Sequence, residues 1–187
     1  VLKYACKLQC WPYSENFKLV QNFHINLIKN VKKKVRKKIK FRPVEGPAYF
    51  SITKNVIKHF KDLSISNSTK TSLKKEFETA KILVCSYPET PIKDALFSNI
   101  PFVILYPKNL YSDFNKYQKI LLPLKKNKIL FHDPKKLSDH LNDIWDYPEF
   151  WWNNIETKNC IKKFKKEVIF DQKKPLNKWS NYLLKFK

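Results

Sequence analysis

The chain has 187 residues, of which 43% are hydrophobic and 15% aromatic, and its formal net charge is +22. This apolar content suffices for a folded core and excludes an intrinsically disordered chain, while the length suits one domain, with or without a helical extension. No apolar run reaches the roughly 18 residues of a membrane span, and the N-terminal residues contain no apolar segment of the signal-peptide type.

Helical and extended segments alternate along the first half of the chain. In order, they are an amphipathic helix over 15–38, a short strand from Ile39 broken at Pro43, a turn at Gly46–Pro47, a helix over 52–61 capped by Ser51, a strand over 63–66 and a helix over 72–81 capped by Ser72. The helical spacing of apolar residues defines the first segment, and short alternation defines the strand at 63–66.

The second half continues the alternation. It comprises a strand over 82–86, a helix over 91–98, a strand over 102–106, a helix near 112–125, a strand over 128–131, helices over 135–146 and 154–168, and a helical tail at 179–187. Strands that alternate with helices predict βαβ units, and continuous apolar strands such as FVIL indicate a sheet buried on both faces. The predicted fold class is α/β, a Rossmann-like parallel sheet flanked by helices, with further helices at the C-terminus.

The positive charge comes almost entirely from lysine, because Arg36 and Arg42 are the only arginines among 38 basic residues. The densest run, KNVKKKVRKKIK at 29–40, would attract any phosphate polymer. Its apolar positions recur at helical spacing, however, so a solvated helix face explains it as well. No nucleic-acid-binding signature accompanies the run. The sequence therefore disfavours a nucleic-acid partner, and a lysine-rich nucleic-acid-binding module remains the alternative function.

The four cysteines, Cys6, Cys10, Cys85 and Cys160, form no CxxC or Cys/His pair with metal-site spacing. The sequence also contains no DxD motif. We expect no metal and no cofactor. Unpaired thiols are typical of a reducing compartment, so we expect a cytoplasmic protein, free or held peripherally at the inner membrane. The chain begins with Val1, and we interpret it as a fragment of a longer protein.

The stretch CSYPETPIKDALFSNIPFVILYP at 85–107 joins two apolar strands through a polar turn and a short helix. Thr90 suits the N-cap, Pro91 the first helical position and Asn99 the left-handed position after the helix. These assignments explain the turn without any ligand. The inward face of the helix is predicted to consist of Ile92, Ala95 and Leu96.

The same turn also suits an anion. The hydroxyls of Ser86, Tyr87 and Thr90 surround a helix start, where free backbone N–H groups and the helix dipole favour a phosphate. Lys93 lies in the first turn, where a cation is unfavourable unless an anion is bound. Ligands of parallel α/β sheets bind at the carboxyl ends of the strands, which is where this turn lies. Both interpretations of the turn stay open at this point.

Residues 80–107 resemble the donor-side motif of GT-B glycosyltransferases, and more narrowly a family of bacterial surface-carbohydrate transferases from polysaccharide and O-antigen loci. The resemblance covers the chain from about residue 17 onward and includes NKILFHDPKKLSDHLNDIWDYPEFWW at 127–152 and KKIKFRP at 37–43. The residues that carry it in the motif are Cys85, Ser86, Tyr87, Thr90, Asp94, Leu96, Asn99, Ile100 and Pro101. Asp94 stands where the family pattern has Glu, Lys128 where it has Gly, and Pro91 where it has a more permissive residue.

This resemblance implies the nucleotide-sugar-binding half of a GT-B-like glycosyltransferase. Residues 1–38 would be a helical segment that links to a missing upstream domain, 39–150 the Rossmann-like donor domain, and 151–187 a C-terminal helical appendage. The missing domain would bind a glycan or lipid-linked acceptor and supply the catalytic base, so the catalytic residues are not assigned. A catalytically silent remnant is a further alternative.

The implied donor-binding residues are Arg42, Ser86, Tyr87, Thr90, Pro91, Lys93, Asp94 and His132. Arg42 would offer a bidentate fork to a phosphate or a sugar carboxylate, and Asp94 would accept from ribose or sugar hydroxyls. Each has an ordinary structural interpretation: a surface arginine before a proline, and a solvated helix residue. His132 would contact the nucleotide, and Asp133 is interpreted as an N-cap. Glu45 could either pair with Arg42 or act on the sugar, and the sequence does not decide between the two.

The remaining histidines and the aromatic cluster are assigned structural roles. His24, His59 and His140 fall in predicted helices and are interpreted as core or surface residues. The aromatic residues at 145–152 could stack a base or a sugar, but such a cluster more often anchors a terminal helix. We therefore expect the cluster to be an anchor.

Overall fold

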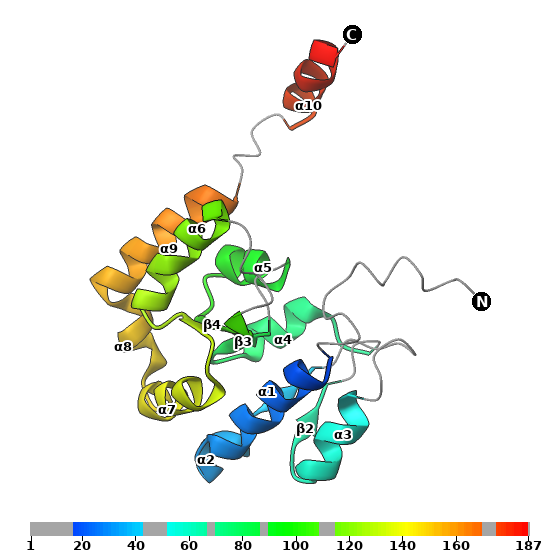
Figure 1. The fold of residues 1–187 in the computed structure, drawn as a ribbon, viewed down its shortest axis with the longest axis vertical. Coiled ribbons are helices and arrows are strands. Elements are labelled where there is room, and N and C mark those ends of the chain that lie inside the picture. Colours follow the sequence, from blue (N-terminus) through cyan, green and yellow to red (C-terminus); the bar gives the residue numbers. More distant parts are fainter. Residues whose placement is uncertain are drawn as a thin grey trace, which may run out of the picture.

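The computed structural model of the protein describes residues 17–42, 52–66, 70–86, 90–108, 115–169 and 175–186 (Figure 1). Several predicted features lie outside these residues. They are the break at Pro43, Glu45, the turn at Gly46–Pro47, the cap at Ser51, Tyr87, and the cysteines Cys6 and Cys10.

Short parallel strands form two sheets in the described part of the chain. They are β1 (Lys40–Phe41) paired with β2 (Ser64–Ile65), and a second sheet of β3 (Leu83–Cys85), β4 (Phe102–Leu105) and β5 (Leu130–Phe131) in that order. The register of the second sheet sets Cys85 beside Ile104, and Leu105 beside Phe131. The predicted α/β class with a Rossmann-like parallel sheet is confirmed.

Helices follow and flank these strands. They are α1 (Phe17–Asn30), α2 (Lys33–Arg36), α3 (Ile52–His59), α4 (Leu73–Thr79), α5 (Thr90–Ser98), α6 (Asn115–Lys126), α7 (Pro134–Ile144), α8 (Pro148–Asn153), α9 (Ile155–Val168), α10 (Pro175–Leu183) and the 3-10 helix η5 (Leu184–Phe186). The sequence did not predict α8, although Pro148 at its start and Glu149 in its first turn are helix-start signals.

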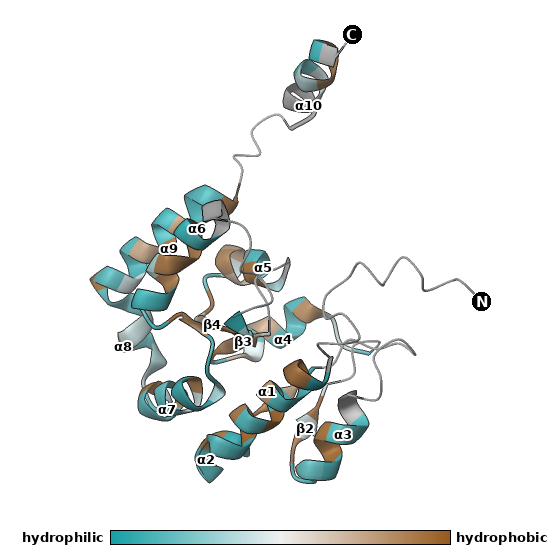
Figure 2. Cartoon of the chain, in the orientation of Figure 1, coloured by the Kyte–Doolittle hydropathy of each residue, from teal (hydrophilic) through white to brown (hydrophobic). Residues whose placement is uncertain are grey.

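The side chains of β4, together with Tyr106 directly after it, divide the core into two layers. Phe102, Ile104 and Tyr106 pack toward α5, α6 and α9, whereas Val103 and Leu105 pack toward α1 and α7. All five are buried, so the strand contacts helices on both faces, as its continuous apolar sequence predicts. Figure 1 shows the sheet between these two groups of helices, and Figure 2 shows hydrophobic residues along β4 and hydrophilic residues on the outer sides of α6, α7 and α9.

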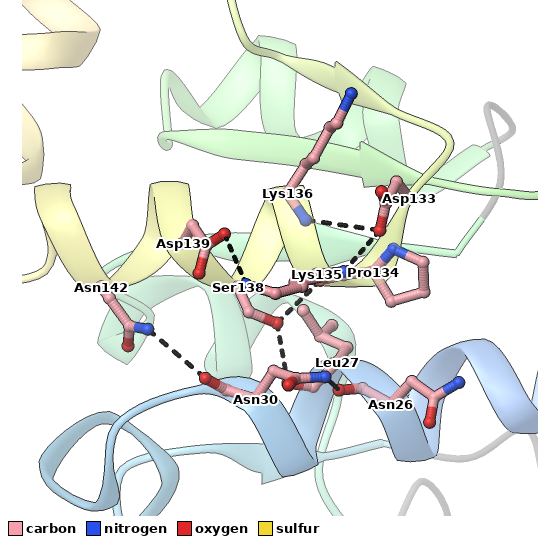
Figure 3. A network of polar contacts seen from close by, with 10 residues as sticks. All are labelled: Asn26, Leu27, Asn30, Asp133, Pro134, Lys135, Lys136, Ser138, Asp139 and Asn142. Atoms are coloured by element: carbon pink, nitrogen blue, oxygen red, sulfur yellow. Dashed lines mark hydrogen bonds and ion pairs between the residues drawn. The ribbon is translucent and has the colours of Figure 1, made fainter.

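The predicted continuous helix over 15–38 is wrong between Asn30 and Lys33. Lys32 is extended, with a ψ angle of 148°, and its backbone N–H donates to Oδ1 of Asn142 at 2.8 Å. The side-chain amide of Asn142 also donates to the carbonyl of Asn30 at 3.5 Å (Figure 3). Asn142 of α7 therefore satisfies backbone groups that the broken helix leaves unpaired. The lysines of this run lie on the solvated face, while Val31 and Val35 are buried.

A buried hydroxyl joins α1 to α7. Ser138 is fully buried, and its Oγ lies 3.1 Å from the carbonyl oxygen of Leu27 and 2.7 Å from that of Pro134 (Figure 3). A buried hydroxyl without partners would cost about 1–3 kcal/mol, so these contacts fix the position of α1 along α7. Because His24 lies on α1, one turn before Leu27, the contact between Ser138 and Leu27 also positions His24.

Two helices end with a residue in the left-handed conformation. Asn99 after α5 has φ 51°, as predicted, and the N–H of Ile100 donates to the carbonyl of Ala95 at 3.1 Å. Lys128 after α6 has φ 55°. The N–H of Ile129 donates to Leu124, and that of Lys128 donates to Lys125, which is the Schellman pattern.

The aromatic cluster contributes to the core through two of its members. The Trp152 ring lies 5.3 Å from that of Phe102, and the Trp151 ring lies 4.9 Å from that of His140. These contacts confirm the interpretation as a structural anchor for Trp151 and Trp152. Tyr147 and Phe150 differ, because both are exposed and contact one another at 5.7 Å.

Candidate functional site

The carboxyl ends of the two sheets lie on the same side of the molecule. Ile39 and Ile82, which precede β1 and β3, pack against the same core cluster beneath α1. At the opposite end of these strands, Phe41 and Ser86 both contact His24: the ring of Phe41 lies 5.9 Å from the imidazole, and Ser86 binds it directly. Parallel α/β sheets bind ligands at this edge, which makes it the candidate site.

A histidine–serine pair lies at the end of β3. Nε2 of His24 is 2.7 Å from the Oγ of Ser86. Burial lowers the pKa of His24 to about 4, so the imidazole is neutral at physiological pH. Its Nδ1 is buried without a partner among the described residues. The pair therefore holds the Ser86 hydroxyl in one place with a neutral ring.

Arg42 lies at the end of β1 in a network of polar side chains. Its Nη1 donates to the Oγ of Ser66 at 3.2 Å, and the same hydroxyl donates to Oε1 of Glu76 at 2.6 Å. Nη1 also lies 3.7 Å from that carboxylate oxygen. In the part of the chain that the structure describes, these contacts involve Nη1 alone. The other edge of the guanidinium, formed by Nη2 and Nε, can donate to a ligand.

Glu76 is the centre of this network. Its Oε2 accepts from the ammonium of Lys40 at 2.8 Å, while Oε1 faces Ser66 and Arg42. The pKa of Glu76 is lowered, first by the hydrogen bond from Lys40, then by that from Ser66, and by the charges of Lys40 and Arg42. The ionised carboxylate thus holds Arg42 at the strand end and leaves one surplus positive charge in the group.

His132 lies at the end of β5. Its Nδ1 is 3.0 Å from the carbonyl oxygen of Tyr106, and because a carbonyl only accepts, Nδ1 carries the proton. Partial burial lowers the pKa of His132, with a smaller contribution from the charges of Lys125 and Lys108. In the neutral ring Nε2 is then an acceptor. Such a nitrogen can receive a hydrogen bond from an amine or a hydroxyl, but repels a phosphate.

The residue after His132 has the predicted structural role. Oδ1 of Asp133 accepts from the backbone N–H groups of Lys135 and Lys136, at 2.8 and 3.4 Å, and so caps α7 (Figure 3). The N-cap interpretation of Asp133 is confirmed.

The remaining predicted site residues belong to α5 and to the turn before it. The helix begins at Thr90, one residue before its predicted start, and its inward residues are buried as predicted. Pro91 is half-buried, and Lys93 and Asp94 are exposed. Tyr87 and the side chain of Thr90 lie outside the description, so their predicted roles stay predictions.

Comparison with protein families decides the affiliation of the chain: the model of the LIC12162 family transferase matches residues 1–183. The chain belongs to the LIC12162 transferase family. Comparisons with curated proteins and with solved structures gave no significant match. The predicted transferase class is thus confirmed for this LIC12162 family member.

Two further observations concern metal-binding groups and membrane-spanning helices among the described residues. No group of three or more histidine, cysteine, aspartate or glutamate side chains could hold a metal ion there. None of the helices of that part is long and apolar enough to cross a membrane.

Sequence reasoning missed the residues that support Arg42 and Ser86 in this transferase. The sequence predicts a structural role for His24 and indicates no role at the site for Ser66, Glu76 or Lys40. The available signal was that Ser66 follows a strand end, like Ser86. Position alone did not reveal that Glu76, on α4, would pair with Arg42.

Proposed function

We propose that this LIC12162 family member is the nucleotide-sugar-binding half of a GT-B-like glycosyltransferase that acts in bacterial surface-polysaccharide synthesis. An upstream domain supplies the glycan or lipid-linked acceptor and the catalytic base. The observation that carries the proposal is the guanidinium of Arg42, held by Ser66 and Glu76 at the carboxyl edge of a parallel sheet.

Arg42 suits the diphosphate of the donor. With Nη1 oriented by Ser66 and Glu76, the Nη2 and Nε edge is pre-organised and loses little entropy when it binds a phosphate. A planar fork also matches two phosphate oxygens, which a lysine cannot do. Of the two arginines in the chain, both of which the structure describes, Arg42 is thus the one at a strand end, where chemistry and position both favour recognition of a phosphate.

Ser86 and the start of α5 form the second phosphate contact. A phosphate beside α5 receives its free N–H groups and the positive end of the helix dipole, and Lys93 in the first turn then faces an anion. The Ser86 hydroxyl donates to the same group, together with Tyr87 and Thr90. These contacts stabilise the leaving nucleotide through dipoles and cations, which is chemistry that needs no metal ion.

His132 is suited to the nucleoside. Because its Nδ1–H donates to the backbone carbonyl of Tyr106, the Nε2 of the neutral ring can accept from a ribose hydroxyl or a base amine. Asp94, on the exposed side of α5, accepts from ribose or sugar hydroxyls. The hydrogen-bond donors that bind the phosphates, Arg42 and the start of α5, are thus distinct from the hydrogen-bond acceptors that bind the nucleoside, His132 and Asp94.

A titration of the isotope-labelled chain with CMP, UDP, GDP and a short RNA, followed by NMR, tests the function. We expect saturable shifts with one nucleotide, unchanged by EDTA. Arg42→Gln removes a charge-assisted pair and should weaken binding about 10- to 100-fold. Thr90→Val and Asp94→Ala should weaken it too, and the binding nucleotide identifies the donor.

The matched control is Arg36→Gln, since Arg36 is the only other arginine and lies on α2, 3.8 Å from Asp62. Its nucleotide affinity should equal that of the unsubstituted chain. Shifts produced only by RNA, fading as salt rises and indifferent to Arg42→Gln, would contradict the transferase function and favour the lysine-rich nucleic-acid module.

A further inference from the structure

The C-terminal helix α10 exposes an apolar strip. Tyr182 and Leu183 lie three and four residues after Trp179, so the three side chains share one side of the helix. Tyr182, Leu183 and Trp179 are 55%, 61% and 64% exposed, respectively, and Leu184, which follows in η5, is 58% exposed. The rings of Trp179 and Tyr182 contact edge to face at 6.3 Å. In Figure 1 the helix stands apart from the sheet and its flanking helices. So much apolar surface on one short helix calls for an apolar environment.

Positive charge surrounds this strip in the sequence. Residues 158–187 contain ten lysines but only two acidic residues, Glu167 and Asp171, and α10 itself contains no acidic residue. On α9, which precedes α10, Lys162, Lys163 and Lys166 line a surface hollow of about 390 Å³ together with Asn159. The C-terminal region therefore combines an apolar strip with a strongly cationic surface.

We propose that α10 lies in the surface of an anionic lipid bilayer, with the strip of Trp179, Tyr182, Leu183 and Leu184 at the acyl-chain boundary and the surrounding lysines on the phosphate headgroups. Charge complementarity selects an anionic surface, and tryptophan and tyrosine prefer the boundary between water and hydrocarbon. A helix of nine residues is far below the roughly 20 needed to cross the bilayer, so it lies on the membrane.

The composition of the strip favours a bilayer over a nucleic acid. Lysines alone would suffice for a polynucleotide, whereas the exposed leucines Leu183 and Leu184 gain nothing from a phosphate backbone. The same leucines gain free energy when they leave water for a bilayer. This surface is separate from the sheet edge of the nucleotide site, so the inference does not depend on the proposed function.

Co-sedimentation of the full chain with lipid vesicles tests the inference. We expect binding to vesicles that mix phosphatidylglycerol with phosphatidylcholine, and about 10-fold or greater loss of binding to phosphatidylcholine alone. The double variant Trp179→Ser, Leu183→Ser should bind the anionic vesicles about 10-fold or more weakly, since it removes two apolar side chains of the strip. Lys162→Glu with Lys166→Glu should also weaken binding, by about fivefold for each lysine.

Two matched controls keep the test specific. Phe150→Ser removes an aromatic side chain that is 73% exposed on α8, and Lys29→Glu with Lys33→Glu reverses the same charges on α1 and α2. Both should retain vesicle binding to within about twofold. The circular dichroism of every variant should match that of the unsubstituted chain.

Three outcomes would overturn the inference. The first is absence of binding to anionic vesicles, and the second is an equal loss of vesicle affinity in Phe150→Ser and in the α10 variant. The third is binding to poly(U) that is tighter than binding to vesicles and is unchanged by the α10 substitutions. Nucleotide titration of the α10 variant should give unchanged shifts, so a failure here leaves the nucleotide site untouched.

Discussion

Nε2 of His24 lies 2.7 Å from the hydroxyl oxygen of Ser86, although the two residues are 62 positions apart. A serine hydroxyl has a single proton to donate. If that proton goes to His24, none remains for a phosphate. If instead the neutral imidazole carries its proton on Nε2, Ser86 accepts from His24 and donates to the ligand. Under the proposed function the second arrangement applies, so His24 positions Ser86.

This relationship predicts coupled effects on nucleotide affinity. His24→Phe keeps a ring beside Phe41 but removes the hydrogen bond, and we expect about fivefold weaker binding, close to that of Ser86→Ala. Since both substitutions remove one interaction, the double variant should be little weaker than either single variant. NMR titration gives the three dissociation constants. Additive losses would show that His24 acts independently of Ser86, and Ser64→Ala, in an exposed serine of β2, should change nothing.

The buried histidines predict acid sensitivity. Burial lowers the pKa of both His24 and His140 to about 4, from 6.5 when exposed, with Lys128 lowering and Asp143 opposing the shift of His140. The unfolded chain therefore takes up protons first, and the free energy of unfolding is highest above pH 6.5 and falls between pH 6.5 and 4. We expect a loss of about 1–3 kcal/mol for each ring.

Urea titrations across this pH range measure the loss. The carboxylate of Glu76 has a lowered pKa, so its contribution is lost only below its ordinary value of 4.5. The interval from pH 6.5 to 4.5 thus isolates the histidines. His140→Phe, which keeps a ring between Phe131 and Trp151, should flatten the slope. An identical slope in that variant would contradict the assignment, and His59→Phe, at an exposed position, serves as the control.

The left-handed conformation of Lys128 predicts that glycine stabilises the fold. A residue with a Cβ at φ 55° is strained by about 1–2 kcal/mol. Glycine removes this strain, but its greater conformational freedom in the unfolded chain offsets part of the gain. Lys128→Gly should therefore raise the free energy of unfolding by about 0.5–1 kcal/mol. Lys126→Gly, inside the last turn of α6, should lower it by about 1 kcal/mol. Thermal unfolding distinguishes the two, and a destabilising Lys128→Gly would refute the strain.

The network around Glu76 predicts a stability difference between two neighbouring carboxylates. Glu76→Gln keeps the shape of the side chain but leaves Lys40 and Arg42 without their counter-charge. We expect a loss of about 1 kcal/mol, since solvent screens part of the network. Glu78→Gln changes an exposed carboxylate on the same helix and should be neutral. Equal unfolding free energies of the two variants would show that the network contributes nothing to stability.

Local patterns in the sequence predicted most of the fold. Ser72 caps α4 by accepting from the N–H of Lys75, Asn99 takes the left-handed position after α5, and the run FVIL forms a strand buried on both faces. Each feature depends on residues within a few positions of one another, so it is visible without the fold. The positions of Arg42, Ser86 and His132 at strand ends could be predicted for the same reason.

The contacts that connect these strand ends could not be predicted locally. His24 matched the inward face of an amphipathic helix, and nothing near it in the sequence indicates that its partner is Ser86. The break after Asn30 depends on Asn142, which lies on a different helix. Both features are consequences of how α1 packs, and helical periodicity predicts which face packs but not against which residues.

The alkylation rate of the Cys85 thiol can report on the opening of this edge of the sheet. It is a free cysteine immediately before Ser86, and burial raises its pKa to about 12. Alkylating reagents attack the thiolate, which the closed structure neither forms at neutral pH nor exposes. We therefore expect the rate of Cys85 alkylation to depend on how often the strand end beneath the candidate site opens. Any ligand that binds at that edge and holds it closed should therefore lower the alkylation rate of Cys85, whatever the identity of the ligand.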